Sequence, residues 1–119
     1  MGLLNELESF GVDVDSAVAR LGGDEEIYEE ILIDFPEDSK NYEILPCFEE
    51  GDYDMACQNA HALKGAAGNL GLDPLYEMYK SVNDLLKDGK NDEARAVYDE
   101  GYALEKEIMD CIKKYADEY

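Results

Sequence analysis

The sequence has 119 residues, of which 45% are apolar and 34% are charged, a composition typical of one folded domain. Thirty acidic against ten basic residues give a formal net charge of −20, and a field of that sign repels DNA, RNA and anionic membranes. Without an apolar run of about 18 residues or a basic start, the chain is expected to have neither a membrane span nor a signal peptide.

Helices are predicted along the whole chain, beginning with two short ones at 3–10 and 15–21. Asp24 is the expected N-cap of a third helix. The apolar stripe of this third region consists of Ile27, Ile31, Leu32 and Phe35 and resumes at Ile44, Leu45 and Phe48. Pro36 and Pro46 interrupt the stripe, so the sequence leaves open one kinked helix or two shorter ones.

Three clearer helices follow. Asp52 caps one that is expected to run to Leu70, Asp73 and Pro74 cap and begin the next, and Asn91 caps the last. The last helix has an apolar seam at Ala94, Val97, Gly101, Leu104, Ile108, Cys111 and Tyr115. Because the connections are short, neighbouring helices are expected to be antiparallel. The sequence therefore predicts an all-α fold, an antiparallel up-down four-helix bundle with short N-terminal helices, as a single domain over 1–119 and a monomer.

The segment from Met55 to Leu72, MACQNAHALKGAAGNLGL, differs from the rest of this charge-dense chain. Its only formal charge is Lys64, and it contains the only histidine, His61. At about 100° per residue, Leu63, Ala66 and Leu70 fall on one side of a helix and His61 falls roughly opposite them. The histidine is therefore expected to point away from the core.

Five residues gather around His61 on that helical face: Cys57, Gln58, Lys64, Gly65 and Gly68. A glycine inside a helix costs about 0.8–1 kcal/mol relative to alanine. Gly65 and Gly68 are expected to give an incoming protein access to the imidazole, the alternative being close helix packing. Lys64, one turn from His61, is expected to bind a phosphoryl oxygen, the alternative being an ordinary solvated lysine.

Three cysteines, Cys47, Cys57 and Cys111, show no CxxC spacing, and a single histidine leaves little for a zinc site. They are interpreted as free buried thiols of a cytoplasmic protein. No metal and no cofactor is expected. The chain also has no GxxxxGK[ST] loop, so it is not expected to be an enzyme that phosphorylates itself from ATP.

The segment AHALKGAAGNLGL resembles the signature of histidine-containing phosphotransfer (HPt) domains, roughly A-H-x-L-K-G-x-A-x-x-x-G. The residues at the matching positions are His61, Leu63, Lys64, Gly65, Ala67 and Gly71. The likeness extends to GVDVDSAVARLGGDEEIYEEILIDF, EEGDYDMACQNAHALKG and LLKDGKNDEARAVYDE.

This resemblance implies a four-helix bundle that accepts a phosphoryl group on His61 from a receiver-domain aspartate and passes it to another receiver. It implies Lys64 as phosphate partner and Gly65 as the residue that leaves the ring accessible. Asn83 stands where family members often have a glutamine that contacts the histidine or phosphate. Tyr79 replaces a small residue and is expected to narrow one side of the site. The implied partners are receiver domains and a hybrid histidine kinase.

Two other functions stay open. The chain could be an adaptor that binds receiver domains through the same surface without phosphorylation. A four-helix metal or cofactor protein would need paired ligands such as Glu-x-x-His, which are absent from the sequence. The initiator Met and the compact length favour a free-standing protein over a piece of a larger kinase.

Overall fold

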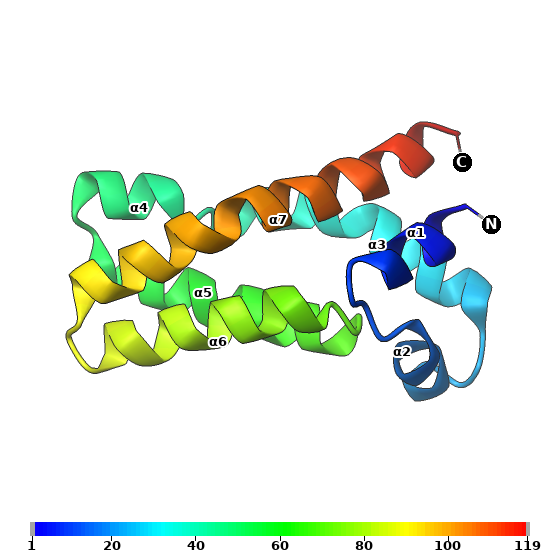
Figure 1. Cartoon of the computed structure of the whole chain (residues 1–119), viewed down its shortest axis with the longest axis horizontal. Coiled ribbons are helices and arrows are strands. Elements are labelled where there is room, and N and C mark those ends of the chain that lie inside the picture. The colour runs from blue at the N-terminus through cyan, green and yellow to red at the C-terminus, as the bar shows by residue number, and fades with distance from the viewer. Residues whose placement is uncertain (1, 119) are drawn as a thin grey trace.

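The computed structural model describes residues 2–118, and all regular structure in this range is helical, which confirms the all-α prediction (Figure 1). The elements are α1 (Leu3–Ser9), α2 (Val14–Arg20), α3 (Glu25–Ser39), the 3₁₀ turn η1 (Lys40–Tyr42), α4 (Leu45–Glu50), α5 (Tyr53–Asn69), α6 (Asp73–Lys87) and α7 (Asn91–Glu118). None of these helices is long and apolar enough to span a bilayer.

The helices α3, α5, α6 and α7 lie roughly along the long axis and alternate in direction along the chain (Figure 1). The helix α6 packs against both α5 and α7, and α3 packs against α7. The short helix α1 packs on α7 and α2 packs on α1 and α3, while α4 packs on α5 at the other end of the molecule. The alternating directions of the four long helices agree with the antiparallel neighbours that the short connections predict (Figure 1).

The two prolines that the sequence left ambiguous belong to two separate helices. The helix α3 continues through Pro36 to Ser39 and ends in η1, and Glu43 is extended (φ −64°, ψ 132°). Pro46 stands in the first turn of α4, where a missing N–H leaves no helical hydrogen bond unmade. The region from Asp24 to Glu50 is therefore two helices with a break between them.

Of the four predicted caps, Asp24 and Asp52 are confirmed and the other two are wrong by one residue. The carboxylate of Asp24 accepts hydrogen bonds from the N–H groups of Glu26 and Ile27, at 3.0 and 3.3 Å. Asp52 accepts one from Met55 N–H at 3.1 Å. Asp73 is the first residue of α6, and the capping position belongs to Leu72, which has no side-chain oxygen to offer. The helix α7 begins at Asn91 itself, and Ala94 N–H donates to the backbone oxygen of Lys90 at 3.0 Å.

The apolar stripe of α3 does not face the core as one unit. Tyr28, Leu32 and Phe35 are buried, whereas Ile27 and Ile31 are 44% and 41% exposed. The hydroxyl of Tyr28 donates to the backbone oxygen of Leu70 at 2.6 Å, so this buried phenol links α3 to the end of α5. The expectation that Ile27 and Ile31 belong to the stripe that packs inward is therefore wrong.

The predicted seam of α7 packs closely on α6. Ala94, Ile108 and Cys111 are buried. At Gly101, an added Cβ would lie 2.6 Å from Met78 Cγ. This glycine lets the two helices approach, which gives a packing reason for its place inside a long helix.

Candidate functional site

The helix α5 presents His61 to solvent. The buried side of α5 consists of Ala56, Asn59, Ala60, Leu63 and Ala67. His61 is exposed, as the helical periodicity predicts. The only histidine of the chain thus stands where another protein can reach it.

The space beside the imidazole is open. A Cβ added at Gly65, one turn after His61, would meet no atom within 4 Å outside its own helical backbone. Gln58 is also exposed and Cys57 is half-buried. This environment agrees with the access interpretation of Gly65.

Lys64 is half-buried on the same face of α5 as His61. The ion pairs found among residues 2–118 involve Lys40, Arg95, Lys106 and Lys114, and none involves Lys64. Its ammonium group is therefore not neutralised by a carboxylate within the described part of the chain.

Gly68 has different surroundings from Gly65. An added Cβ would lie 3.1 Å from Cδ1 and 3.3 Å from Cε1 of Tyr76 on α6. This geometry favours the packing alternative for Gly68, because the missing side chain makes room for the tyrosine ring and not for a partner.

Asn83, the expected phosphate-contacting residue of α6, is fully buried. Its Nδ2 donates to the backbone oxygen of Cys57 at 3.0 Å and lies 3.4 Å from Cys57 Sγ. Its Oδ1 is buried without a hydrogen-bond partner among the described residues. The side chain is buried and links α6 to α5, so the structure does not support a direct phosphate contact.

Tyr79 is also fully buried, and its hydroxyl donates to Glu105 Oε2 on α7 at 2.5 Å. Tyr98 donates to the other oxygen of the same carboxylate at 2.8 Å. Burial, followed by the charge of Glu105, raises the pKa of both phenols. The prediction that Tyr79 narrows the site is wrong, because its ring belongs to the core between α6 and α7.

Sequence reasoning missed a groove of about 630 Å³ beside the site. The groove, called here the α3–α5 groove, is lined by Arg20, Leu21, Ile31, Phe35, Asp38, Ser39, Tyr42, Ala62, Leu63, Ala66, Asn69 and Leu70. The guanidinium of Arg20, one of these lining residues, donates to the backbone oxygen of Gly68 at 2.8 Å. Ile31, which the apolar pattern assigns to the inward-facing stripe of α3, is 41% exposed and lines this groove, so the sequence offered no separate signal for it.

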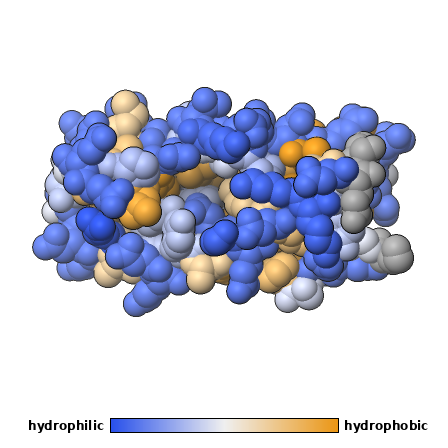
Figure 2. Space-filling model, turned by 90° about the horizontal axis from the view of Figure 1, so that it is seen from above, coloured by the Kyte–Doolittle hydropathy of each residue, from blue (hydrophilic) through white to orange (hydrophobic). Residues whose placement is uncertain are grey.

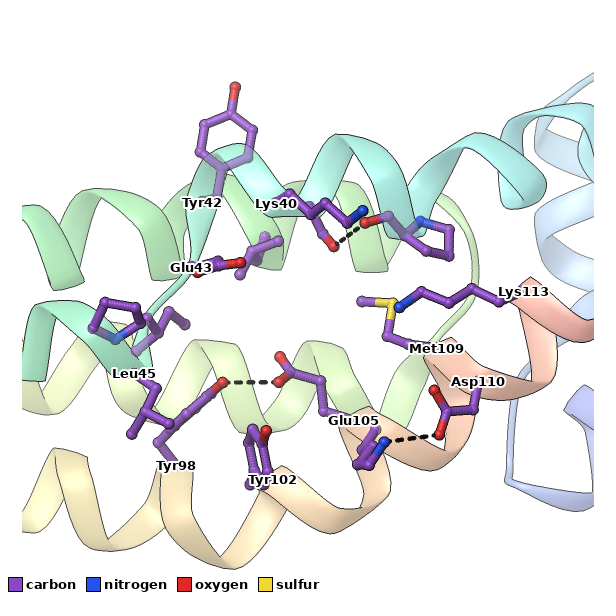
Figure 3. Close-up of a pocket in the computed structure, with 16 residues that line it drawn as sticks. Lys40, Tyr42, Glu43, Leu45, Tyr98, Tyr102, Glu105, Met109, Asp110 and Lys113 are labelled. Atoms are coloured by element: carbon purple, nitrogen blue, oxygen red, sulfur yellow. Dashed lines mark hydrogen bonds and ion pairs between the residues drawn. The ribbon is translucent and has the colours of Figure 1, made fainter. Parts of the chain in front are cut away.

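A second cavity, of about 350 Å³, lies between α7 and the segment of η1 and α4 (Figure 3). Tyr98, Tyr102, Glu105 and Met109 of α7 form one of its walls. Seen from above, the molecule is mostly hydrophilic, with small hydrophobic patches in the middle of the view and at its edges (Figure 2). His61 does not line this cavity.

The cysteines are free thiols, with Cys47 and Cys111 buried and Cys57 half-buried. Burial raises the pKa of Cys47, and burial together with Glu6 raises that of Cys111 to about 12, so both stay protonated. Among residues 2–118, no group of three or more His, Cys, Asp and Glu side chains is placed to share a metal ion.

The chain was also compared with known proteins. The family model described as Hpt domain matches residues 25–115, a range that contains His61 and every helix of the bundle except the end of α7. A search of curated proteins found no match, and neither did a search of solved structures.

Proposed function

This chain belongs to the Hpt domain family, whose members take part in phosphotransfer in two-component phosphorelays, and on that basis we propose that it is a histidine phosphocarrier. In this proposal His61 accepts a phosphoryl group from a receiver-domain aspartate and passes it to the aspartate of another receiver. The carrier works in the cytoplasm as a monomer. The observation that carries the proposal is the exposed histidine of α5 with open space at Gly65.

The reaction is an in-line transfer. The lone pair of Nε2 of the neutral imidazole attacks phosphorus, the N–P bond forms, and the aspartyl oxygen–phosphorus bond breaks with its electron pair going to the carboxylate. The proton on Nδ1 stays in place, so no other group has to donate or accept one. Catalysis of this kind depends on positioning and charge stabilisation. Within this chain, Lys64 supplies positive charge to the phosphoryl oxygens and the receiver supplies the remaining catalytic groups.

The surroundings of His61 also fit docking of a receiver. The exposed strip of α5 has few charges, and the α3–α5 groove exposes Ile31, Ala62 and Ala66 beside it. Interfaces of transient complexes combine an apolar centre with a polar rim. The acidic remainder of the bundle provides such a rim and opposes contact with other acidic surfaces.

Label transfer from a phosphorylated receiver tests the proposal. The wild type is expected to acquire an acid-labile phosphoryl group, and His61→Gln is expected to acquire none while keeping the helical circular dichroism of the wild type. Binding of the receiver without any label on the wild type would contradict the proposal and favour the unphosphorylated adaptor. Label on both proteins would show that another residue is the acceptor.

A further inference from the structure

Two contacts fix how α5 and α6 align across their antiparallel interface. Near one end, Asn83 Nδ2 donates to Cys57 O at 3.0 Å. Near the other, Gly68 lies against the ring of Tyr76, since an added Cβ would be 3.1 Å from Cδ1. The middle of the stretch from Tyr76 to Asn83 on α6 is therefore level with the middle of the stretch from Cys57 to Gly68 on α5.

Lys80 stands at that middle point of α6. It follows Tyr76 by four residues and precedes Asn83 by three, so the three side chains share one face of the helix. The row of α5 that meets this face continues from Cys57 through His61 and Lys64 to Gly68 at the same spacing. Lys80 is thus level with His61 and Lys64 across the α5–α6 interface.

The exposure of Lys80 sets it apart from its neighbours on this face. Asn83 is buried and Tyr76 is half-buried, but Lys80 is exposed, so it stands on the outer edge of the interface, the edge on which His61 is exposed. Helices in contact lie about 8–10 Å apart, and the flexible four-carbon stem of a lysine covers much of that distance.

Lys80 is also free to bind an anion. The ion pairs among residues 2–118 do not involve it. Glu77 and Asp84, on the same helix at three and four residues from Lys80, are exposed and form no ion pair with it within the described range.

We infer that Lys80 is a second phosphate-binding residue, which contacts the phosphoryl oxygens on His61 from α6 while Lys64 contacts them from α5. The inference rests on the proposed function. Phosphorylation adds nearly two negative charges to a chain whose net charge is already −20. Ammonium groups on two different helices would offset that charge with charge-assisted hydrogen bonds. Lys80 forms no covalent bond in the transfer.

The test measures how a phosphoryl group distributes at equilibrium between a receiver and this protein. Lys80→Ala is expected to shift the distribution toward the receiver about three- to fivefold, the upper range for an exposed ion pair. Lys80→Arg is expected to stay near the wild type because it keeps the charge. Lys87→Ala is the matched control, because it removes the same charge from the same face of α6 about two turns away and is expected to change little.

Chemical labelling with potassium phosphoramidate, which needs no receiver, separates this inference from the proposed function. If the wild type is labelled on His61 and Lys80→Ala keeps the wild-type distribution, Lys80 has no phosphate role and the proposed function stands. Equal shifts in Lys80→Ala and Lys87→Ala would overturn the inference in favour of a general charge effect. A wild type that takes no label from phosphoramidate or from the receiver would overturn both.

Discussion

Apart from Lys64, the residues beside His61 on α5 are small or uncharged, and their surroundings differ in ways that experiments can separate. Gly65 faces open space and Gly68 faces the ring of Tyr76. The backbone oxygen of Cys57 accepts a hydrogen bond from the Asn83 side chain. These differences determine which residues leave the site accessible and which join α5 to α6.

Stability measurements should distinguish the two glycines. Alanine is favoured over glycine in a helix by about 0.8–1 kcal/mol, and at Gly65 nothing opposes the added methyl group. Gly65→Ala is predicted to raise the free energy of unfolding in urea by about 0.5–1 kcal/mol. Gly68→Ala should raise the free energy of unfolding clearly less, because the added Cβ would lie 3.1 Å from Cδ1 of Tyr76. Equal gains at both positions would contradict the packing role of Gly68.

Asn83 allows a test of whether its amide serves structure or phosphate binding. Its Oδ1 is buried without a partner among the described residues, and leucine has a similar shape without that oxygen. Burying an unsatisfied polar group costs about 1–3 kcal/mol, and replacing Asn83 by leucine recovers part of that cost. The same replacement loses the hydrogen bond from Asn83 Nδ2 to Cys57 O, so the two effects oppose each other. Asn83→Leu is predicted to unfold at the same or a higher urea concentration and to keep wild-type phosphotransfer. A large loss of transfer with unchanged stability would restore a phosphate role for Asn83.

At the scale of elements, one carboxylate of α1 binds three side chains of α7, in addition to the burial of Leu3 and Leu7 on α1. Glu6 accepts hydrogen bonds from Cys111 Sγ at 3.1 Å, Lys114 Nζ at 3.1 Å and Tyr115 Oη at 3.0 Å. These three donors, Cys111 first, hold the pKa of the Glu6 carboxyl below its usual value.

This lowered pKa predicts that α1 loosens in acid. Because the folded-state pKa is lower, the stabilisation is present above the unfolded value of about 4.3 and is lost as the pH falls through the folded value. The NMR amide signals of α1 should therefore shift toward unfolded positions below about pH 4, before those of α5 and α6. Glu6→Gln should show weakened α1 signals already at pH 6, and Glu8→Gln, on the exposed side of α1, should not. An intact α1 in Glu6→Gln would refute this link.

The helices were predictable from sequence where local signals act alone. Asp24 and Asp52 cap their helices through their own carboxylates, and the 3.6-residue period placed His61 on the exposed side of α5. Neither signal depends on the packing of other elements.

Apart from the caps, the errors concern which side chains are buried, and there a neighbouring helix decides. On α3, Tyr28 is buried in place of Ile27 because its hydroxyl finds the backbone oxygen of Leu70 across the bundle. On α6, Tyr79 and Asn83 were assigned to the site by resemblance, yet both lie on the buried face with Val82. A phenol or an amide can be buried when another helix supplies its hydrogen bond, and one sequence does not show that partner.

At the scale of the whole molecule, buried phenols join the helices of a chain that has a large negative charge. Tyr28 links α3 to the end of α5, and Tyr79 and Tyr98 converge on Glu105. The four ion pairs among residues 2–118 are all exposed and contribute little.

Alkaline pH should therefore destabilise the bundle. Burial raises the pKa of Tyr28, Tyr79 and Tyr98 above the unfolded value of about 10. The stabilisation of the fold by these neutral phenols is therefore complete below about pH 10 and is lost as the pH rises above it. The free energy of unfolding, followed by circular dichroism, is predicted to fall above about pH 10. The free energy of unfolding of Tyr79→Phe should fall less over this pH range than that of the wild type. Tyr102→Phe, at an exposed position, should show the same fall as the wild type. A flat profile for the wild type would contradict this account.

The central claim is that the exposed imidazole of α5 receives a phosphoryl group. Mass-spectrometric mapping of the protein, after brief incubation with a phosphorylated receiver and handling at neutral to alkaline pH, tests it most directly. The account predicts a phosphoryl group on the peptide that contains His61 and none elsewhere. An unmodified His61 beside a receiver that still transfers its phosphoryl group to a known Hpt domain would contradict it.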